Sequence, residues 1–205
     1  MSTSSKRWLK EHFEDVYVKK AKEKGYPSRA AYKLLEIQEK YNFIKQGMWV
    51  IDLGAAPGGW SMIAKEFVGD VGKVFALDCL PMQEITGVEF IQGDFTQQAT
   101  LDALLDKIGS KNIDLVLSDM APNLSGCKEI DQPKIMYLAE LAWSLAQQVL
   151  SPNGFFLIKI FQGAEVDLFV KILRKHFKKV VYSKPKASRS RSAEIYILAS
   201  NFIRL

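Results

Sequence analysis

The sequence predicts an α/β fold with a seven-stranded, mostly parallel sheet, an antiparallel last strand and helices on both faces. Apolar runs of strand length alternate with segments of helical periodicity along most of the chain. Residues 48–61 combine a buried strand, a glycine-containing turn and the start of a helix, which is typical of a ligand loop in such sheets. A short polar turn joins the last two strands, so they are expected to pair as an antiparallel hairpin.

The strands are expected where short apolar runs are bounded by turn residues. They are residues 48–53, 74–78, 88–91, 113–118, 155–161, 180–183 and 194–199. An open sheet of this kind binds its ligands at the edge where the parallel strands end. We therefore look for functional side chains directly after these runs.

The helices are expected where apolar residues recur at helical spacing. They are residues 29–40, with Ser28 as N-cap, followed by 61–67, 98–108, 135–150 and 166–177. Residues 151–154, Ser-Pro-Asn-Gly, are expected to end the fourth of these helices. Residues 124–133 are polar and are expected to form a mobile loop beside the site.

The 205 residues fit a single domain, 28–205, preceded by a basic arm, 1–27. Residues 6–24 mix cations with aromatic side chains, as expected of an arm or a helix that settles on RNA or docks on its own domain. No apolar run is long enough for a membrane span, and residues 1–10 do not resemble a signal peptide, so we expect a cytoplasmic protein. Cys79 and Cys127 give no disulfide framework or zinc pattern.

The net charge of +5 is unevenly distributed. Residues 1–33 hold nine Lys or Arg and four acids, and residues 171–191 hold nine and no acid. Residues 34–170 hold nine Lys or Arg against eighteen acids. Basic ends around an acidic middle suit a bound polyanion, although a solvated face explains such runs equally well.

The loop after the first strand differs from two common nucleotide motifs. Ala56 replaces the second glycine of the dinucleotide fingerprint, which disfavours a nicotinamide-dependent dehydrogenase. Trp60 stands where a phosphate-binding P-loop needs its lysine. The spelling Asp-x-Gly-x-x-Pro-Gly-Gly-Trp-Ser, residues 52–61, resembles instead the first motif of S-adenosylmethionine-dependent methyltransferases in its RrmJ/FtsJ form.

Three charged residues are expected at one edge of the sheet. Asp119 follows the fourth strand, and Lys159 lies among the apolar residues of the fifth, where an amine costs energy unless it is paired or used. Glu194 is the first residue of the last strand. Because that strand is expected to be antiparallel, it begins at the edge of the sheet where the parallel strands end. Lys33, on the first helix, can be exposed or can reach inward to the same place.

From Ser28 to the C-terminus the chain resembles the RrmJ/FtsJ (RlmE) family of ribosomal RNA large-subunit 2′-O-ribose methyltransferases. This resemblance implies a Rossmann-like methyltransferase fold. The family's catalytic Lys-Asp-Lys-Glu set matches Lys33 in Ser-Arg-Ala-Ala-Tyr-Lys, Asp119 in Ser-Asp-Met-Ala-Pro-Asn, Lys159 in Leu-Ile-Lys-Ile-Phe-Gln-Gly and Glu194 in Ser-Arg-Ser-Ala-Glu-Ile-Tyr. Lys159 would act as a neutral base or as a cation that stabilises the developing alkoxide. No metal is implied.

The resemblance implies S-adenosyl-L-methionine as cofactor. The implied contacts are Gly58, Trp60, Asp78, Asp94 and Asp119. Asp78, at the end of the second strand, would hold the ribose hydroxyls, although it could equally be a strand-end turn residue. Asp94 would accept from the adenine amino group, with Phe95 against the ring.

The implied substrate is a uridine in the A-loop of 23S ribosomal RNA within the large ribosomal subunit, with a tRNA or an mRNA cap as alternatives. We expect a monomer with no membrane partner. Candidate phosphate contacts are Lys6, Arg7, Lys10, Arg29, Lys184, Lys186, Arg189 and Arg191. A non-catalytic RNA-binding assembly factor with the same fold would not need Lys159. Amino-directed DNA and cytosine-C5 enzymes are disfavoured by the residues after Asp119, and a small-molecule enzyme would not need the basic flanks.

Overall fold

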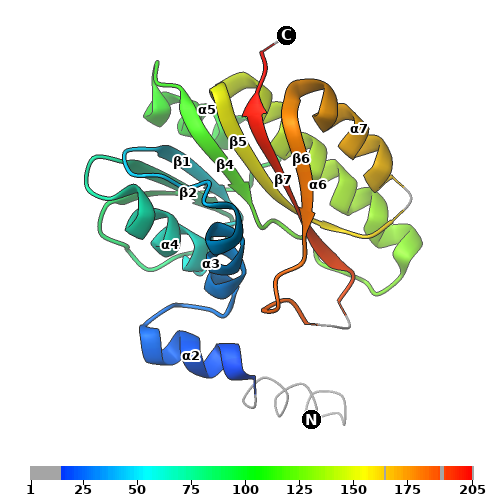
Figure 1. Cartoon of the computed structure of the whole chain (residues 1–205), viewed down its shortest axis with the longest axis horizontal. Helices are drawn as coiled ribbons and strands as arrows, with labels where there is room; N and C mark the ends of the chain where they lie inside the picture. Colours follow the sequence, from blue (N-terminus) through cyan, green and yellow to red (C-terminus); the bar gives the residue numbers. More distant parts are fainter. Residues whose placement is uncertain (1–14, 164, 190–191, 205) are drawn as a thin grey trace.

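The computed structural model describes residues 15–163, 165–189 and 192–204, and it is built on a seven-stranded sheet (Figure 1). The strand order is β3-β2-β1-β4-β5-β7-β6. The strands are β1 Trp49–Leu53, β2 Lys73–Asp78, β3 Val88–Gln92, β4 Ile113–Ser118, β5 Leu150–Phe161, β6 Phe177–Ser183 and β7 Glu194–Phe202. β7 pairs antiparallel with both β5 and β6, whereas β1 to β5 pair in parallel. The predicted mostly parallel sheet with an antiparallel last strand is confirmed.

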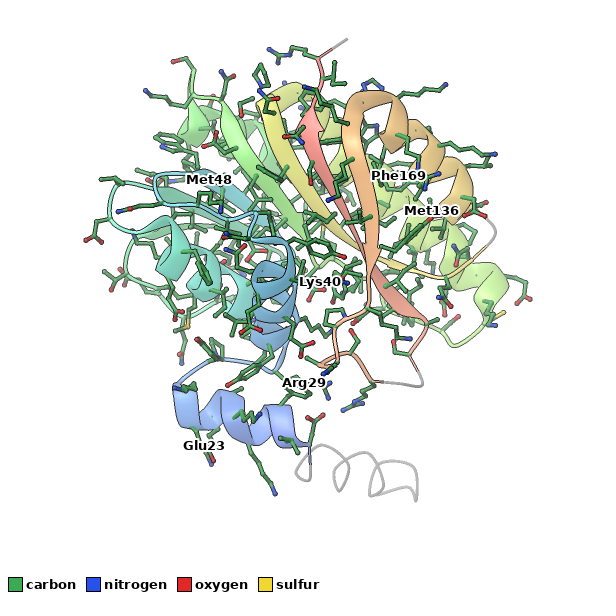
Figure 2. All side chains as sticks on the ribbon, viewed as in Figure 1. Glu23, Arg29, Lys40, Met48, Met136 and Phe169 are labelled. Atoms are coloured by element: carbon green, nitrogen blue, oxygen red, sulfur yellow. The ribbon has the colours of Figure 1, made fainter. Side chains whose placement is uncertain are left out.

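Helices cover both faces of this sheet, as predicted. They are α2 Val16–Lys24, α3 Ala30–Tyr41, α4 Gly59–Val68, α5 Gln98–Ile108, α6 Lys128–Val149 and α7 Val166–His176. α3 and α4 pack on one face in a cluster that includes Leu34, Ile63 and Leu157. α5, α6 and α7 pack on the other face, where Met136 and Phe169 are labelled in Figure 2. Successive strand residues alternate between the two clusters, as period-2 geometry requires.

The beginning of α6 differs from the prediction of a loop over residues 124–133. α6 starts at Lys128 and contains Pro133. The carboxylate of Asp131 accepts hydrogen bonds from the backbone N–H groups of Ser125 and Gly126 and from the Ser125 hydroxyl. These bonds tie the preceding turn to the helix, which offsets the backbone bond that a proline cannot donate. The loop therefore ends before Lys128 rather than at the proline.

Other boundaries also differ from the sequence prediction, including the start of β6 at Phe177 instead of 180 and the end of β7 at Phe202 instead of 199. Residues 151–154 do not separate α6 from the fifth strand, because β5 already begins at Leu150 and pairs there with Ile113. The register shifts after that pair, and Asn153 adopts a positive φ of 65°. At α3 the N-cap is Arg29 rather than Ser28, although the Ser28 hydroxyl still accepts from the Ala30 N–H at 3.2 Å.

The helix α2 precedes the segment, from Ser28 onward, that resembles the methyltransferase family. Asp15 caps it by accepting from the Tyr17 N–H at 2.9 Å. α2 packs on α3, where the rings of Tyr17 and Tyr32 lie 5.6 Å apart. Residues 16–24 are thus helical, while the predicted RNA contacts Lys6, Arg7 and Lys10 lie outside the described residues. None of the described helices is long and apolar enough to cross a bilayer.

Candidate functional site

The loop from Gly54 to Gly59 lies between the tips of three central strands. The N–H groups of Gly54 and Ala55 donate to the Leu77 carbonyl at the end of β2. Gly54 has a φ of 76°, and a Cβ there would lie 2.8 Å from the backbone nitrogen of Met120, after β4. Only glycine allows this close approach without strain. The loop is therefore held against the segment that carries Asp119.

The same loop fits the cofactor that the methyltransferase motif implies. Gly58 has a φ of 104°, and a Cβ there would lie 2.7 Å from the Ile85 side chain and 3.0 Å from the Met82 sulfur. α4 follows directly, and the N–H groups of its first turn have no partners within the helix. Apolar side chains, a glycine cradle and free N–H groups suit a nucleoside with a polar tail.

The five predicted cofactor residues are placed differently around this loop. Trp60 is 2% exposed, and its indole donates to the Ala30 carbonyl and packs on Tyr196. A cofactor contact by Trp60 would therefore have to come from its backbone. Asp78 accepts from the Ala56 N–H at 2.9 Å and from the Leu80 N–H at 2.8 Å, so it braces the loop and its own turn.

Asp94 lies on the turn after β3, as predicted. Its Oδ1 accepts from the Thr96 N–H at 2.9 Å and from the Thr96 hydroxyl at 2.8 Å. These hydrogen bonds hold the pKa of the Asp94 carboxyl below its usual range, so it remains an acceptor at neutral pH. Phe95 beside it is partly buried against the core on the α5 side.

Lys159 forms an ion pair with Asp119 across two neighbouring strand ends. The Lys159 Nζ lies 3.0 Å from the Asp119 Oδ1 and also donates to the Asp119 backbone carbonyl. The Lys159 side chain is 8% exposed. A buried amine is stable only with such partners, so this pair accounts for the lysine in an apolar strand.

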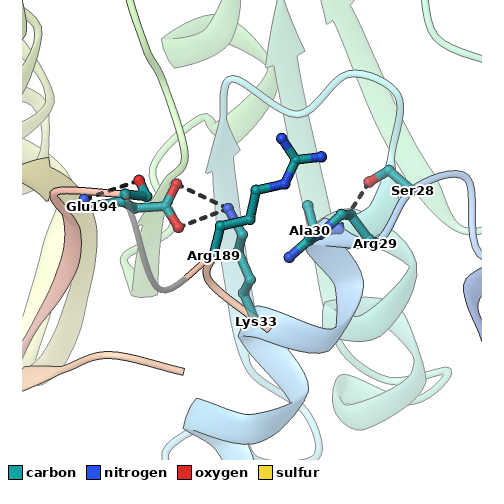
Figure 3. A pocket seen from close by; sticks show the side chains of 7 residues that line it. Ser28, Arg29, Ala30, Lys33, Arg189 and Glu194 are labelled. Carbon is teal, nitrogen blue, oxygen red and sulfur yellow. Dashed lines mark hydrogen bonds and ion pairs between the residues drawn. The ribbon is translucent and has the colours of Figure 1, made fainter. Parts of the chain in front are cut away.

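Lys33 and Glu194 form a second ion pair, drawn in Figure 3, between α3 and the start of β7. The Lys33 Nζ lies 2.8 Å from one Glu194 oxygen and 2.9 Å from the other. The Ser188 hydroxyl also donates to Glu194 at 2.8 Å. Of the two environments open to Lys33, the structure shows the inward one.

The charge state of Glu194 follows from these contacts. Burial by itself raises the pKa of the Glu194 carboxyl, but the contacts with its neighbours, led by the charge and hydrogen bond of Lys33, together outweigh it. The Ser188 hydrogen bond and the charge of Lys159 act in the same direction as Lys33. The pKa therefore lies below its usual value, and Glu194 is a carboxylate at neutral pH.

Tyr196 joins the two ion pairs, although no sequence motif predicted a role for it. In the antiparallel register it lies directly opposite Lys159, and its hydroxyl donates to the Asp119 Oδ1 at 3.2 Å. It is fully buried, and burial together with the charges of Asp119 and Glu194 raises the pKa of the phenol well above its usual value. Its spacing of two from Glu194 places both side chains on one face of β7, a signal that the sequence contains.

A hollow of about 280 Å³ opens beside the Lys33–Glu194 pair (Figure 3). It is lined by Ser28, Arg29, Ala30, Lys33, Arg189, Ser192 and Glu194. Lys33 and Arg29 in this lining are each paired with a carboxylate, so Arg189 is the cation that would meet an anionic ligand beside the Lys33–Glu194 pair. The basic loop after β6 forms one of its walls.

Some of the cations predicted to contact phosphates already form ion pairs or hydrogen bonds within the protein. The Arg29 guanidinium pairs with Asp15 and donates to the Ala187 carbonyl. Burial, followed by the charge of Arg189, lowers the pKa of Arg29. Lys184 donates to the Ser192 carbonyl at 2.9 Å. Lys186 is exposed, Arg189 lines the hollow, and Arg191 lies outside the described residues.

Comparison with known proteins finds similar chains and similar solved structures. A model of FtsJ-like methyltransferases matches residues 26–202. The ribosomal RNA large subunit methyltransferase E of Alkalilimnicola ehrlichii is 58% identical over 97% of this chain and 95% of its own. A crystal structure from Plasmodium falciparum, provisionally described as a ribosomal RNA methyltransferase, has a TM-score of 0.77 at 30% identity and covers 86% of this chain and 98% of its own.

A third comparison concerns the fold alone. Fibrillarin from Aeropyrum pernix, solved with natively bound S-adenosyl-L-methionine, has a TM-score of 0.55 at 16% identity, and the match covers 83% of this chain and 73% of fibrillarin. The Rossmann-like methyltransferase fold expected from the sequence is thereby confirmed.

Proposed function

The chain belongs to the FtsJ-like methyltransferase family, and we propose that it methylates the ribose 2′-hydroxyl of a uridine in the A-loop of large-subunit ribosomal RNA. The protein is an S-adenosylmethionine-dependent RNA methyltransferase. The nearly full-length match to a large-subunit ribosomal RNA methyltransferase supports this RNA as substrate. The choice of the A-loop uridine comes from the family resemblance of the motifs around Lys33, Asp119, Lys159 and Glu194.

The Lys159–Asp119 pair is the feature that best supports ribose methylation. It lies next to the Gly54–Gly59 loop, because Gly54 contacts Met120 directly after Asp119. A hydroxyl brought to the pair would thus lie beside the bound cofactor. The cofactor supplies a methyl group that its sulfonium already activates, so the protein has to orient the hydroxyl and assist loss of its proton.

We assign the reaction to Lys159 and Asp119. Lys159 can accept the hydroxyl proton as a neutral amine, or it can stabilise the developing alkoxide as an ammonium group. Asp119 orients Lys159 in either case. Orientation of this kind contributes up to ~7–11 kcal/mol to a reaction barrier.

Lys33 and Glu194 act as the positioning pair in this proposal. Their ion pair borders the hollow, and Tyr196 connects it to Asp119. The ribose enters from the hollow, with its phosphates near Arg189 and Lys186. For the cofactor, we propose contacts by Gly58, the Trp60 backbone, Asp78, Asp94 and Asp119, whose positions surround the loop.

Substitution of Lys159 tests the assignment. Lys159→Ala should lower methyl transfer by roughly 10²–10⁴-fold, because it removes the group that handles the hydroxyl proton. Cofactor binding, measured by calorimetry, should remain, since Lys159 itself is not among the proposed cofactor contacts. Lys45→Ala, at an exposed position, serves as control. Near-normal turnover in Lys159→Ala would rule out the assignment.

A second experiment tests the identity of the methylated RNA independently of the roles assigned to the residues. The protein is incubated with tritiated S-adenosylmethionine and large subunits, small subunits, free ribosomal RNA or tRNA, and the labelled nucleotide is mapped. We expect label on one ribose of the large-subunit RNA. Label on tRNA, or on a base, would contradict the proposed substrate or the proposed reaction respectively.

A further inference from the structure

A second group of cations lies away from the site, on α7 and the beginning of β6. Residues 171–179 contain five Lys or Arg and no acid. The five are Lys171, Arg174, Lys175, Lys178 and Lys179, and we call them the distal basic surface. All five side chains are exposed. Within the described part of the chain, none of the five takes part in an ion pair.

The sheet separates the distal basic surface from the catalytic pairs. β7 begins at Glu194, in the site, and ends at Phe202, which pairs with Phe177 at the start of β6. Eight residue steps of extended chain cover about 26 Å. Figure 1 shows the same arrangement, with the end of α7 and the start of β6 near the C-terminus and the loop after β6 at the opposite end.

Local stability explains only part of this cluster. Arg174 and Lys175 lie in the last turn of α7, where cations interact favourably with the helix dipole. Lys178 and Lys179 lie on the edge strand β6, where lysines hinder pairing with another chain. Neither effect requires Lys171, which lies one helical turn after Asp167, and residues 168–183 contain no acid to offset the mutual repulsion of the five cations. Such a surface is stabilised when a polyanion lies against it.

We propose that the distal basic surface binds phosphates of the RNA substrate outside the segment that is methylated. This inference rests on the proposed function, because it takes the partner to be the ribosomal RNA that also enters the catalytic hollow. Exposed lysines on flexible stems are suited to phosphate contacts that do not depend on base sequence. Contacts at two points about 26 Å apart would also fix the orientation of the protein on a large, folded RNA.

The proposal predicts a difference between long and short RNA. A hairpin that carries the methylated loop on a stem shorter than the ~26 Å between the two surfaces cannot occupy both, whereas the large-subunit RNA can reach both. We therefore compare the triple variant Lys171→Gln, Lys178→Gln and Lys179→Gln with a matched control, Lys45→Gln, Lys107→Gln and Lys111→Gln. Both variants lose three positive charges, and the control positions are also exposed.

Equilibrium binding to both RNAs is measured over a range of salt concentrations. For the long RNA, the distal variant should bind more weakly than the wild type, and its log–log salt slope should fall by about two to three units, because each lysine that no longer neutralises a phosphate removes about one unit. For the hairpin, affinity and slope should match those of the wild type. The control variant should match the wild type on both RNAs.

Two results would overturn the proposal. One is an unchanged salt slope of the distal variant on the long RNA. The other is an equal loss of affinity on the hairpin, which would indicate a general charge effect. Because binding is measured without methyl transfer, these results are distinct from failure of the proposed function, which would appear as absence of ribose methylation by the wild-type protein.

Discussion

Asp52 has a buried carboxyl at the base of the Gly54–Gly59 loop. Its Oδ2 accepts from the Ser61 hydroxyl at 2.6 Å, whereas its Oδ1 has no partner among the described residues. Burial, followed by the charges of Asp119 and Asp78, raises the pKa of Asp52 to about 7, although the Ser61 hydrogen bonds act in the opposite direction. At neutral pH this group is therefore close to its midpoint.

This raised pKa makes stability fall with increasing pH. Between the ordinary pKa of 3.8 and the folded value of about 7, the folded state binds a proton that the unfolded state has lost. The free energy of unfolding should decrease by about 4 kcal/mol across this range from Asp52 alone. Asp52→Asn should remove this dependence, as measured by urea unfolding at pH 4.5 and 7.5. Asp70→Asn, at an exposed position, should retain it, and an unchanged pH dependence in Asp52→Asn would contradict the assignment.

The residues that the sequence could and could not identify differ in a physical way. Lys159 stands out because an amine in an apolar strand needs a partner, and Asp119 and Glu194 follow from strand-end positions. Tyr196 acts through its hydrogen bond to Asp119, and Glu36, on α3, acts by accepting from the backbone N–H groups of Lys186 and Ala187, all far away in the chain. A tyrosine in a strand and a glutamate on a helix are common in structural roles, so only the packed structure separates them from their neighbours.

At the scale of elements, α3 holds the basic loop that follows β6. The Glu36 carboxylate accepts hydrogen bonds from the backbone N–H groups of Lys186 and Ala187, the second at 3.0 Å. The same loop carries Ser188, which donates to Glu194. Since Lys33 lies one turn before Glu36, one helix positions both the ion pair and the wall of the hollow.

Removing the Glu36 anchor should impair RNA recognition more than chemistry. Glu36→Ala leaves two loop N–H groups without their charged acceptor, and loosening the loop should raise KM for RNA by about tenfold, equivalent to ~1.4 kcal/mol. The value of kcat and the affinity for S-adenosylmethionine should change little. Glu39→Ala, on an exposed face of the same helix, is the control. A fall in kcat with unchanged KM would show that Glu36 does not act through the loop.

The regular elements were predictable because their periodicity is strong, and the errors occur where side chains override local signals. The strands and the antiparallel pairing of β7 follow from apolar runs and a short connection. The start of α6 does not, because Pro133 suggests a break, while Asp131 bonds to Ser125 and Gly126 and keeps the chain helical. These hydrogen bonds span only five or six residues, so the signal is local, but the spacing of apolar residues does not include it.

For the whole molecule, folding divides a charge pattern that looks continuous in the sequence. The basic stretch 171–191 reads as one flank. In the structure its later part lies at the hollow beside Lys33 and Glu194, with Arg189 in the wall, whereas residues 171–179 lie at the other end of β6 and β7. Strand length thus converts one run of cations into two surfaces, which the sequence alone could not separate.

Cofactor binding should stabilise the entire fold, because the glycine loop connects the central strands. The loop bonds to Leu77 and Asp78 of β2 and contacts Met120 after β4. At a concentration 100 times its Kd, S-adenosylmethionine should add ~2.7 kcal/mol to the free energy of unfolding. For a domain of this size the melting temperature should rise by about 5–11 °C, as measured by calorimetry.

Two variants and a second nucleotide test whether the rise in melting temperature comes from binding on the glycine loop. Lys159→Ala should keep most of the shift, because Lys159 itself is not among the proposed cofactor contacts, although it pairs with Asp119. Gly58→Ala should lose it, because the added Cβ is strained at a φ of 104° and would lie 2.7 Å from Ile85. NAD should give no shift, since Ala56 replaces a glycine that a dinucleotide needs. An equal shift with NAD, or a full shift in Gly58→Ala, would mean that the ligand binds elsewhere than on this loop.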